Sequence, residues 1–263
     1  MSQPVRVSAV SFLNARPLVV GLERETALFD VSTDLPSTCA ARLHAHEVDL
    51  GLIPAIEYVR GDYALVPGMA IGSDGPILSV AIFTTTPMAR VKRLALDTSS
   101  RTSVALTHVL CAKLWQVAPE MVAAPPDLDQ MLAVADAALI IGDPALDVDP
   151  LPAGVEKIDL GEAWQTLTGL PFVYAAWTGR PGVLTAAHVA ALTVARDRGV
   201  ASLDSLAIEA AAGDPVRAGT FASYLRHNLR YTFGPREQAG LERFHALAAE
   251  VGHTSRGLPL RFY

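Results

Sequence analysis

The chain contains little cysteine, few aromatic residues and no excess of basic side chains. Its two cysteines, Cys39 and Cys111, lie far apart and lack the paired spacing of a metal site. We expect two free, buried thiols, and a disulfide between them is disfavoured. The net charge of −6 over 263 residues argues against a general nucleic-acid-binding protein, which needs a basic face. A small anion needs only a local cluster of donors.

Segments that direct a chain to a membrane or out of the cell are also missing. The first residues, MSQPVRVSAV, have no basic stretch followed by a long apolar one, so no secretory signal is predicted. No run approaches the ~18 consecutive apolar residues of a membrane span. We therefore expect a cytoplasmic protein with no membrane partner.

Several catalytic motifs do not occur. The chain has no G-x-x-x-x-G-K-[ST] phosphate loop and no G-x-S-x-G nucleophile turn. His44 and His46 are two residues apart on an expected helix, so their rings point to different faces and a metal site is not expected. The sequence thus predicts neither a metal nor another cofactor.

What is present is a pattern typical of an α/β fold. Hydrophobic residues make up 51% of the chain, which is enough for a well-buried core. Short apolar runs alternate with helical stretches, which favours largely parallel strands. Strands are expected at Val5–Val10, Phe29–Thr33, Leu50–Ile53, Ala64–Met69, Leu78–Thr84, Arg93–Leu96, Ala137–Ile141 and Phe172–Trp177. Helices are expected near Arg16–Glu23, Ser37–His46, Thr102–Trp115, Leu128–Val134 and Gly161–Leu167.

One pattern occurs twice. LPSTCAARLHAHEVDLGLIPAIEY and APPDLDQMLAVADAALIIGDPALD share a proline, an amphipathic helix, an aspartate and an apolar strand. Asp49 and Asp136 occupy matching places. The pattern suggests two lobes of related construction, although any βαβ unit has a similar outline.

After Trp177 the chain is mainly helical and carries arginine but no lysine. Helices without strands of their own need a sheet to pack against. We therefore expect the tail to return to the first lobe. The predicted lobes are residues 1–84 with 177–263, and residues 85–176, separated by a ligand cleft.

Ligands of such sheets collect beyond the carboxyl ends of the strands. The DTSSRTS turn, Asp97 to Ser103, precedes an expected helix and offers five hydroxyl groups. Free N–H groups and the positive end of the helix dipole favour a carboxylate or phosphate there. Simple N-capping by Ser99 or Ser100 is the alternative.

Two other turns contribute candidates. GSDGPILS is either a plain turn or a turn that brings Ser79 to the mouth of the cleft. Glu57 is the one carboxylate in an expected cleft turn, and a structural salt bridge would explain it equally well. The predicted site is therefore rich in neutral hydrogen-bond donors and poor in acid–base groups.

Taken in order, these segments resemble a known family. SFLNARPL, GLIPAIEY, SDGPILSV, TSSRTSVAL, DAALIIGDPAL, DLGEAWQTLTGLPFVYAAW and YLRHNLRYTFGPREQAGLERF are similar to the MqnA family, the chorismate dehydratases of the futalosine route to menaquinone. The resemblance implies a two-lobed fold like that of type II periplasmic binding proteins. It also implies a lyase, which removes water from chorismate to give 3-[(1-carboxyvinyl)oxy]benzoate, with a substrate carboxylate as proton acceptor.

The resemblance also suggests roles for residues. It implies that Asn14 and Ser79 are catalytic. Hydroxyl groups that would bind substrate carboxylates are those of Ser11, Ser73, Ser99, Thr102 and Ser103. Arg16 is a further candidate, which pairs either with substrate or with an acidic neighbour. The third turn reads IPAIEY where many members have ISSIEY, which weakens any role for a hydroxyl there.

Two other functions stay open. One is a small-carboxylate binding protein of the same fold that performs no chemistry. The other is the related 1,4-dihydroxy-6-naphthoate synthase, whose typical first turn, with a Pro-Asn-Asp segment, is not seen here. The sequence leaves a homodimer open.

Overall fold

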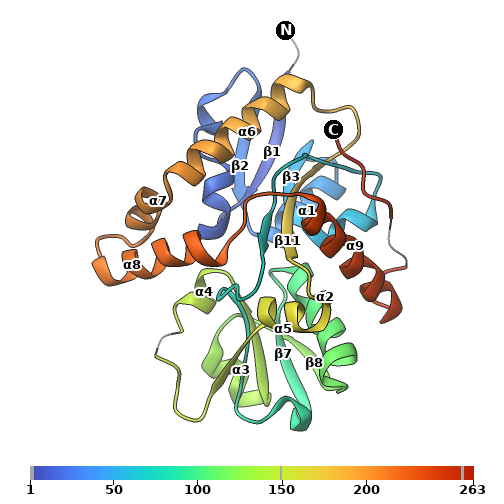
Figure 1. Ribbon diagram of the computed structural model, residues 1–263, viewed down its shortest axis with the longest axis vertical. Coiled ribbons are helices and arrows are strands. Elements are labelled where there is room, and N and C mark those ends of the chain that lie inside the picture. Colours follow the sequence, from blue (N-terminus) through green and yellow to red (C-terminus); the bar gives the residue numbers. More distant parts are fainter. Residues whose placement is uncertain (1–2, 149, 256–257) are drawn as a thin grey trace.

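The computed structural model describes residues 3–148, 150–255 and 258–263. Two separate sheets form the upper and lower parts of the molecule (Figure 1). The first sheet contains β1 (Val5–Val10), β2 (Phe29–Asp34), β3 (Leu50–Pro54), β4 (Ala64–Leu65), β5 (Ile71–Ser73) and β11 (Phe172–Gly179). Its order is β2-β1-β3-β11-β4, and β5 also pairs with β11. Strands β1, β2 and β3 are parallel, whereas β11 runs antiparallel to its neighbours.

The second sheet is built on the same plan. It contains β6 (Val80–Thr84), β7 (Arg93–Asp97), β8 (Glu120–Ala124), β9 (Ala137–Ile141) and β10 (Glu156–Asp159), in the order β10-β6-β9-β7-β8. Strands β7, β8 and β9 are parallel, and β6 and β10 pair in antiparallel fashion. Each sheet therefore has three parallel strands followed by an antiparallel strand.

Asp49 and Asp136, which occupy matching places in the repeated sequence pattern, make equivalent contacts in the two sheets. The Asp49 carboxylate accepts a hydrogen bond from the backbone N–H of Arg6 at 3.1 Å. The Asp136 carboxylate accepts one from the backbone N–H of Arg93 at 3.0 Å. Each aspartate precedes the last of the three parallel strands of its sheet and binds the first of these three, so the repeated sequence pattern corresponds to a repeated structural unit.

Three strand predictions need correction. Strands β8 and β10 were not expected, and the single strand expected over Ala64–Met69 is replaced by β4 and β5. The sequence of β10 reads EKID and that of β8 reads EMVAA. Both lie at the edge of their sheet, where charged side chains face solvent and the alternating apolar pattern is weak. The sheets are also mixed and not largely parallel.

The sheet pairings place two strands differently from the predicted lobes. Residues 80–84 were assigned to the first lobe, but β6 pairs with β9 and β10 of the second sheet. Residues 172–176 were assigned to the second lobe, but β11 pairs with β3 and β5 of the first sheet. The division into two lobes that move as units stays a prediction.

Helices cover both sheets (Figure 1). They are α1 (Pro36–His44), α2 (Arg101–Leu110), α3 (Leu128–Val134), α4 (Asp143–Leu146), α5 (Leu160–Thr168), α6 (Ala186–Ala201), α7 (Leu203–Ala210), α8 (Pro215–Ser223) and α9 (Pro235–Glu250). The segment expected as a helix over Arg16–Glu23 instead forms two 3-10 helices, η1 (Leu13–Leu18) and η2 (Leu22–Arg24). Proline 17 lies inside η1 and has no N–H to continue an α-helix.

The tail helices contact elements that carry the first sheet. Helix α6 packs on η1, and α9 packs on β11. The contact with η1 is so close that a Cβ atom at Gly199 would lie 2.0 Å from the carbonyl oxygen of Pro17. Only glycine fits there, so the tail fixes the position of η1.

Candidate active site

A cleft of about 450 Å³, its open mouth included, lies between the two sheets. Its lining is mainly apolar and comes from both sheets and from the turns that follow their strands. The lining residues are Val10, Phe12, Asn14, Pro36, Pro54, Ile71, Ile77, Ser79, Val80, Ser100, Ser103, Ile141, Gly142, Tyr174 and Ala175.

The polar groups of the cleft are neutral. They belong to Asn14, Ser79, Ser100, Ser103 and Tyr174, and none of the described lining residues is charged. Burial raises the pKa of Tyr174 well above its ordinary value, so this phenol stays protonated. Such a lining can donate hydrogen bonds and orient a ligand, but it offers no base for use near neutral pH.

Asn14 is held in place by its neighbours in η1. Leu13 and Ala15 are buried, and their apolar side chains anchor the helix in the core. The backbone N–H of Leu13 donates to the Asp143 carboxylate at 3.1 Å, which ties η1 to α4. The side-chain oxygen of Asn14 is buried and has no hydrogen-bond partner among the described residues. A buried acceptor without a partner is costly, and a ligand in the cleft would satisfy it.

Ser79 lies immediately before β6 and is fully buried. The residue before it, Leu78, has a φ of 64°, a backbone conformation that leucine rarely adopts. The Asp159 carboxylate supports this turn by accepting from the N–H groups of Ile77 at 3.0 Å and Leu78 at 2.6 Å. The Tyr224 hydroxyl donates to the Ser79 hydroxyl at 2.7 Å. The turn of GSDGPILS therefore does bring Ser79 to the cleft.

The N-terminus of α2 opens on the same cleft. Ser100 is its N-cap, and its hydroxyl oxygen accepts from the backbone N–H of Ser103 at 3.4 Å. The Ser103 hydroxyl donates to the Ser100 hydroxyl at 3.2 Å. The capping interpretation is thus correct for Ser100. The anion site stays a prediction, supported by the place of both serines in the cleft lining.

Glu57 positions α2 from outside the cleft. Its buried carboxylate binds Arg101 at 2.9 Å, His44 at 2.8 Å and Arg60 at 3.1 Å. Burial by itself would raise the pKa of Glu57, but the hydrogen bond from His44 and the two guanidinium groups lower it below its ordinary value. Because Arg101 is the first residue of α2, this ionised carboxylate is a structural anchor.

The structure brings some predicted site residues together and leaves others apart. Asn14, Ser79 and Ser103 line the cleft. Of the other predicted binders, none is among the lining residues. Ser11 is exposed, and Arg16 pairs with Glu209 at 3.3 Å. The Ser73 hydroxyl lies 3.2 Å from the Tyr174 hydroxyl, and the buried hydroxyl oxygen of Ser99 has no described partner. The Thr102 hydroxyl accepts from the N–H of Ile56 at 3.1 Å.

Sequence reasoning did not single out four residues that contribute to the site. Tyr174 and Tyr224 lie within two of the segments that resemble the family, DLGEAWQTLTGLPFVYAAW and YLRHNLRYTFGPREQAGLERF, but neither segment indicates their contacts with Ser73 and Ser79. Phe12 and Gly142 lie within segments that were singled out, SFLN and IGDP. A Cβ atom at Gly142 would lie 2.9 Å from the Phe12 ring, which explains the glycine at the end of β9.

Two features are absent from the described residues. Within residues 3–148, 150–255 and 258–263, no group of three His, Cys, Asp or Glu residues is arranged to hold a metal ion. In the same ranges, no helix has both the length and the apolar character needed to cross a membrane.

Comparisons with known proteins agree with this architecture. A chorismate dehydratase of Thermus thermophilus is 29% identical over 261 residues, which cover 87% of this chain and 94% of that protein. The structure of protein AF1704 from Archaeoglobus fulgidus has a TM-score of 0.73 at 17% identity and covers 96% of this chain and 99% of its own. The CA3427 gene product of Candida albicans, described as having the generic periplasmic binding protein fold, has a TM-score of 0.65 at 10% identity, covering 97% and 92%.

These likenesses confirm the predicted α/β fold of the periplasmic-binding-protein type. Residues 5–250 match the protein family described as menaquinone biosynthesis. This match spans nearly the whole chain, including η1, the turn before β6 and the tail helix α8. The chain therefore belongs to the menaquinone-biosynthesis family.

Proposed function

We propose that this protein is a chorismate dehydratase, a lyase that converts chorismate to 3-[(1-carboxyvinyl)oxy]benzoate and water. The observation that carries the proposal is the cleft in which Asn14 and Ser79 lie together among neutral donors, without a charged side chain in the described lining. The Thermus thermophilus relative, named a chorismate dehydratase, supports the same activity.

The reaction removes a proton from the ring carbon that bears the enolpyruvyl ether and a hydroxide from the neighbouring carbon. The electrons of the broken C–H bond form the new ring double bond, and the ring becomes aromatic. The proton and the hydroxide together make the released water. Because aromatisation supplies a large driving force, holding the substrate in the reactive geometry can provide much of the catalysis.

The site residues have separate tasks in this proposal. The Ser79 hydroxyl donates to the departing oxygen, and the Asn14 amide orients the ring and stabilises the charge that develops. The N-terminus of α2, with the hydrogen-bonded pair Ser100 and Ser103, receives one substrate carboxylate. A carboxylate of the substrate accepts the ring proton. This last assignment is supported by the lack of an ionisable base in the described lining.

Purified protein incubated with chorismate tests the proposal. Chromatography with mass detection should reveal a product 18 mass units lighter than chorismate, by the loss of one water, with the absorbance of a substituted benzoate. Boiled protein controls for the spontaneous breakdown of chorismate. Absence of this product, at protein concentrations that bind chorismate, would refute the lyase.

A second candidate is a carboxylate-binding protein without chemistry. The fold likeness to a protein described as having the generic periplasmic binding protein fold favours it. Calorimetric binding of chorismate without turnover would support this candidate, and turnover would exclude it.

A further inference from the structure

Tyr224 lies directly behind the cleft. It begins a π-helical turn, η6 (Tyr224–Asn228), that continues α8 of the tail. Such widened turns are rare and often occur at functional sites. The side chain is buried and is 145 residues away in sequence from Ser79, which its hydroxyl contacts. A residue of the tail thus reaches the turn that begins the second sheet.

The hydrogen bond to Ser79 has a direction. The Tyr224 hydroxyl donates and the Ser79 oxygen accepts at 2.7 Å. A serine hydroxyl has one proton and two lone pairs. Because a lone pair receives the Tyr224 proton, the proton of Ser79 has to point elsewhere. Ser79 lines the cleft, so its proton is available to a ligand there.

The side chain of Asn14 also acts on Tyr224. Burial raises the pKa of Tyr224, and the side chains of Ser79 and Asn14 act against this rise. The amide oxygen of Asn14 is buried and has no described hydrogen-bond partner.

We propose that Tyr224 is a positioning residue that sets the direction in which the neighbouring Ser79 hydroxyl donates its hydrogen bond. Because the Ser79 oxygen accepts the Tyr224 proton, Ser79 offers its own proton to the cleft at a fixed place. This arrangement fits a ligand oxygen that accepts a hydrogen bond from Ser79. The inference rests on the proposed function and adds to it a residue that does not touch the substrate.

The chain offers a matched control for the test. Tyr231 is also buried in the tail, and its hydroxyl has no described hydrogen-bond partner. Tyr224→Phe should lower kcat about tenfold or more, because a small loss of alignment is costly in an oriented site. KM should change by less than about twofold, since the lost contact does not bind substrate directly. Tyr231→Phe should leave both constants unchanged.

A double-mutant cycle separates positioning from general stability. If Tyr224 acts through Ser79, Tyr224→Phe should add little to the kcat loss of Ser79→Ala. Independent, multiplying effects would overturn the proposal, as would a Tyr224→Phe protein that has wild-type kcat or does not fold.

Crystal structures give a readout that needs no turnover. Tyr224→Phe should change the side-chain torsions of Asn14 or Ser79, whereas Tyr231→Phe should not. Unchanged torsions in both variants would overturn the positioning role. A wild-type protein without turnover would refute the dehydratase proposal alone, because the torsions would still decide the role of Tyr224.

Discussion

The carboxylate of Asp143 accepts a hydrogen bond from the backbone N–H of Leu13 at 3.1 Å, across 130 residues of sequence. Asp143 begins α4, shortly after β9 of the second sheet, and Leu13 begins η1, shortly after the first strand of the first sheet. This bond therefore connects the two sheets next to Asn14. It makes the position of the Asn14 amide depend on how the sheets sit against each other.

Loss of this bond should impair turnover. Asp143→Ala leaves the Leu13 N–H without its acceptor and frees the start of η1, so kcat should fall by about tenfold or more. Asp143→Asn keeps an oxygen that can accept the bond and should retain most of the activity. Steady-state kinetics measure kcat of the two variants and test this difference. Equal losses in both would show that the charge of Asp143 matters and the bond does not.

Asn14→Ala should separate activity from folding. The amide oxygen has no described partner, so its removal should leave the melting temperature within about 2 °C of wild type. If Asn14 stabilises charge in the reaction, kcat should fall by about 10²-fold or more. Thermal denaturation and product formation measure the two quantities. Full activity in this variant would remove Asn14 from the mechanism.

Substitutions at two neighbouring residues of α2, Ser103 and Thr102, should have opposite effects on KM and on stability. Ser103→Ala removes a hydroxyl from the cleft and should raise KM about three- to tenfold with kcat unchanged, as expected for roughly 1 kcal/mol of binding. Thr102→Val leaves the N–H of Ile56 unpaired in the core and should cost about 1–3 kcal/mol of stability, with KM unchanged. A rise of KM in Thr102→Val would place its hydroxyl on the ligand after all.

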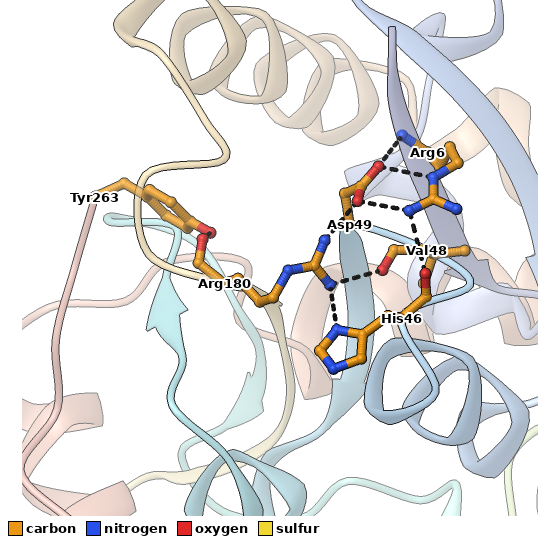
Figure 2. A network of polar contacts seen from close by, with 6 residues as sticks. All are labelled: Arg6, His46, Val48, Asp49, Arg180 and Tyr263. Carbon is orange, nitrogen blue, oxygen red and sulfur yellow. Dashed lines mark hydrogen bonds and ion pairs between the residues drawn. The ribbon is translucent and has the colours of Figure 1, made fainter. Parts of the chain in front are cut away.

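The stability should depend on pH through Asp49. In the network of Figure 2, Asp49 accepts from the Arg6 side chain at 2.8 Å and from Arg180 at 2.6 Å. The hydrogen bond from Arg6, with further bonds from the Arg6 backbone and Arg180, lowers the pKa of Asp49 to about 2 although partial burial opposes this. A lowered pKa stabilises the fold above the ordinary pKa of 3.8, and this stability is lost as the pH falls toward 2.

Urea unfolding of Asp49→Asn tests this dependence. At pH 7 the variant should be less stable by about 1 kcal/mol, a value reduced for solvent screening. The difference should shrink as the pH falls from about 4 to 2. Asp136→Asn is the comparison for the contribution of the guanidinium groups. Hydrogen bonds from the backbone N–H groups of Lys92 and Arg93 lower the pKa of Asp136 without a guanidinium contact, so its pH dependence should have the same sign. A constant difference for Asp49→Asn at all pH values would contradict the assignment.

Much of the fold could be predicted from local sequence patterns. Strand β9 was predicted with its observed bounds because its apolar run is fully buried, whereas the polar edge strand β10 gave no such signal. Asn14 was placed in the cleft because it follows a strand at a predictable edge of a sheet, whereas the turn before Ser79 had been left open between a plain turn and the cleft mouth.

Contacts between distant segments could not be read from the sequence. Thr102 was assigned to the ligand, yet its hydroxyl accepts from Ile56, in the turn after β3. Tyr224 had no assigned role because its contact with Ser79 arises only when the tail helices pack back on the first sheet. The side chain that completes a site can thus lie in a segment whose local pattern does not indicate the contact.

A cleft lined by neutral dipoles in a chain of net charge −6 has a kinetic consequence. The protein as a whole repels a dianion at long range, while no charged side chain among the described lining residues draws it in. Added salt screens the repulsion over distances beyond about 10 Å but has little effect on hydrogen bonds inside the cleft. The association rate of an anionic substrate should therefore rise with ionic strength, the reverse of the behaviour of a cleft lined with arginine or lysine.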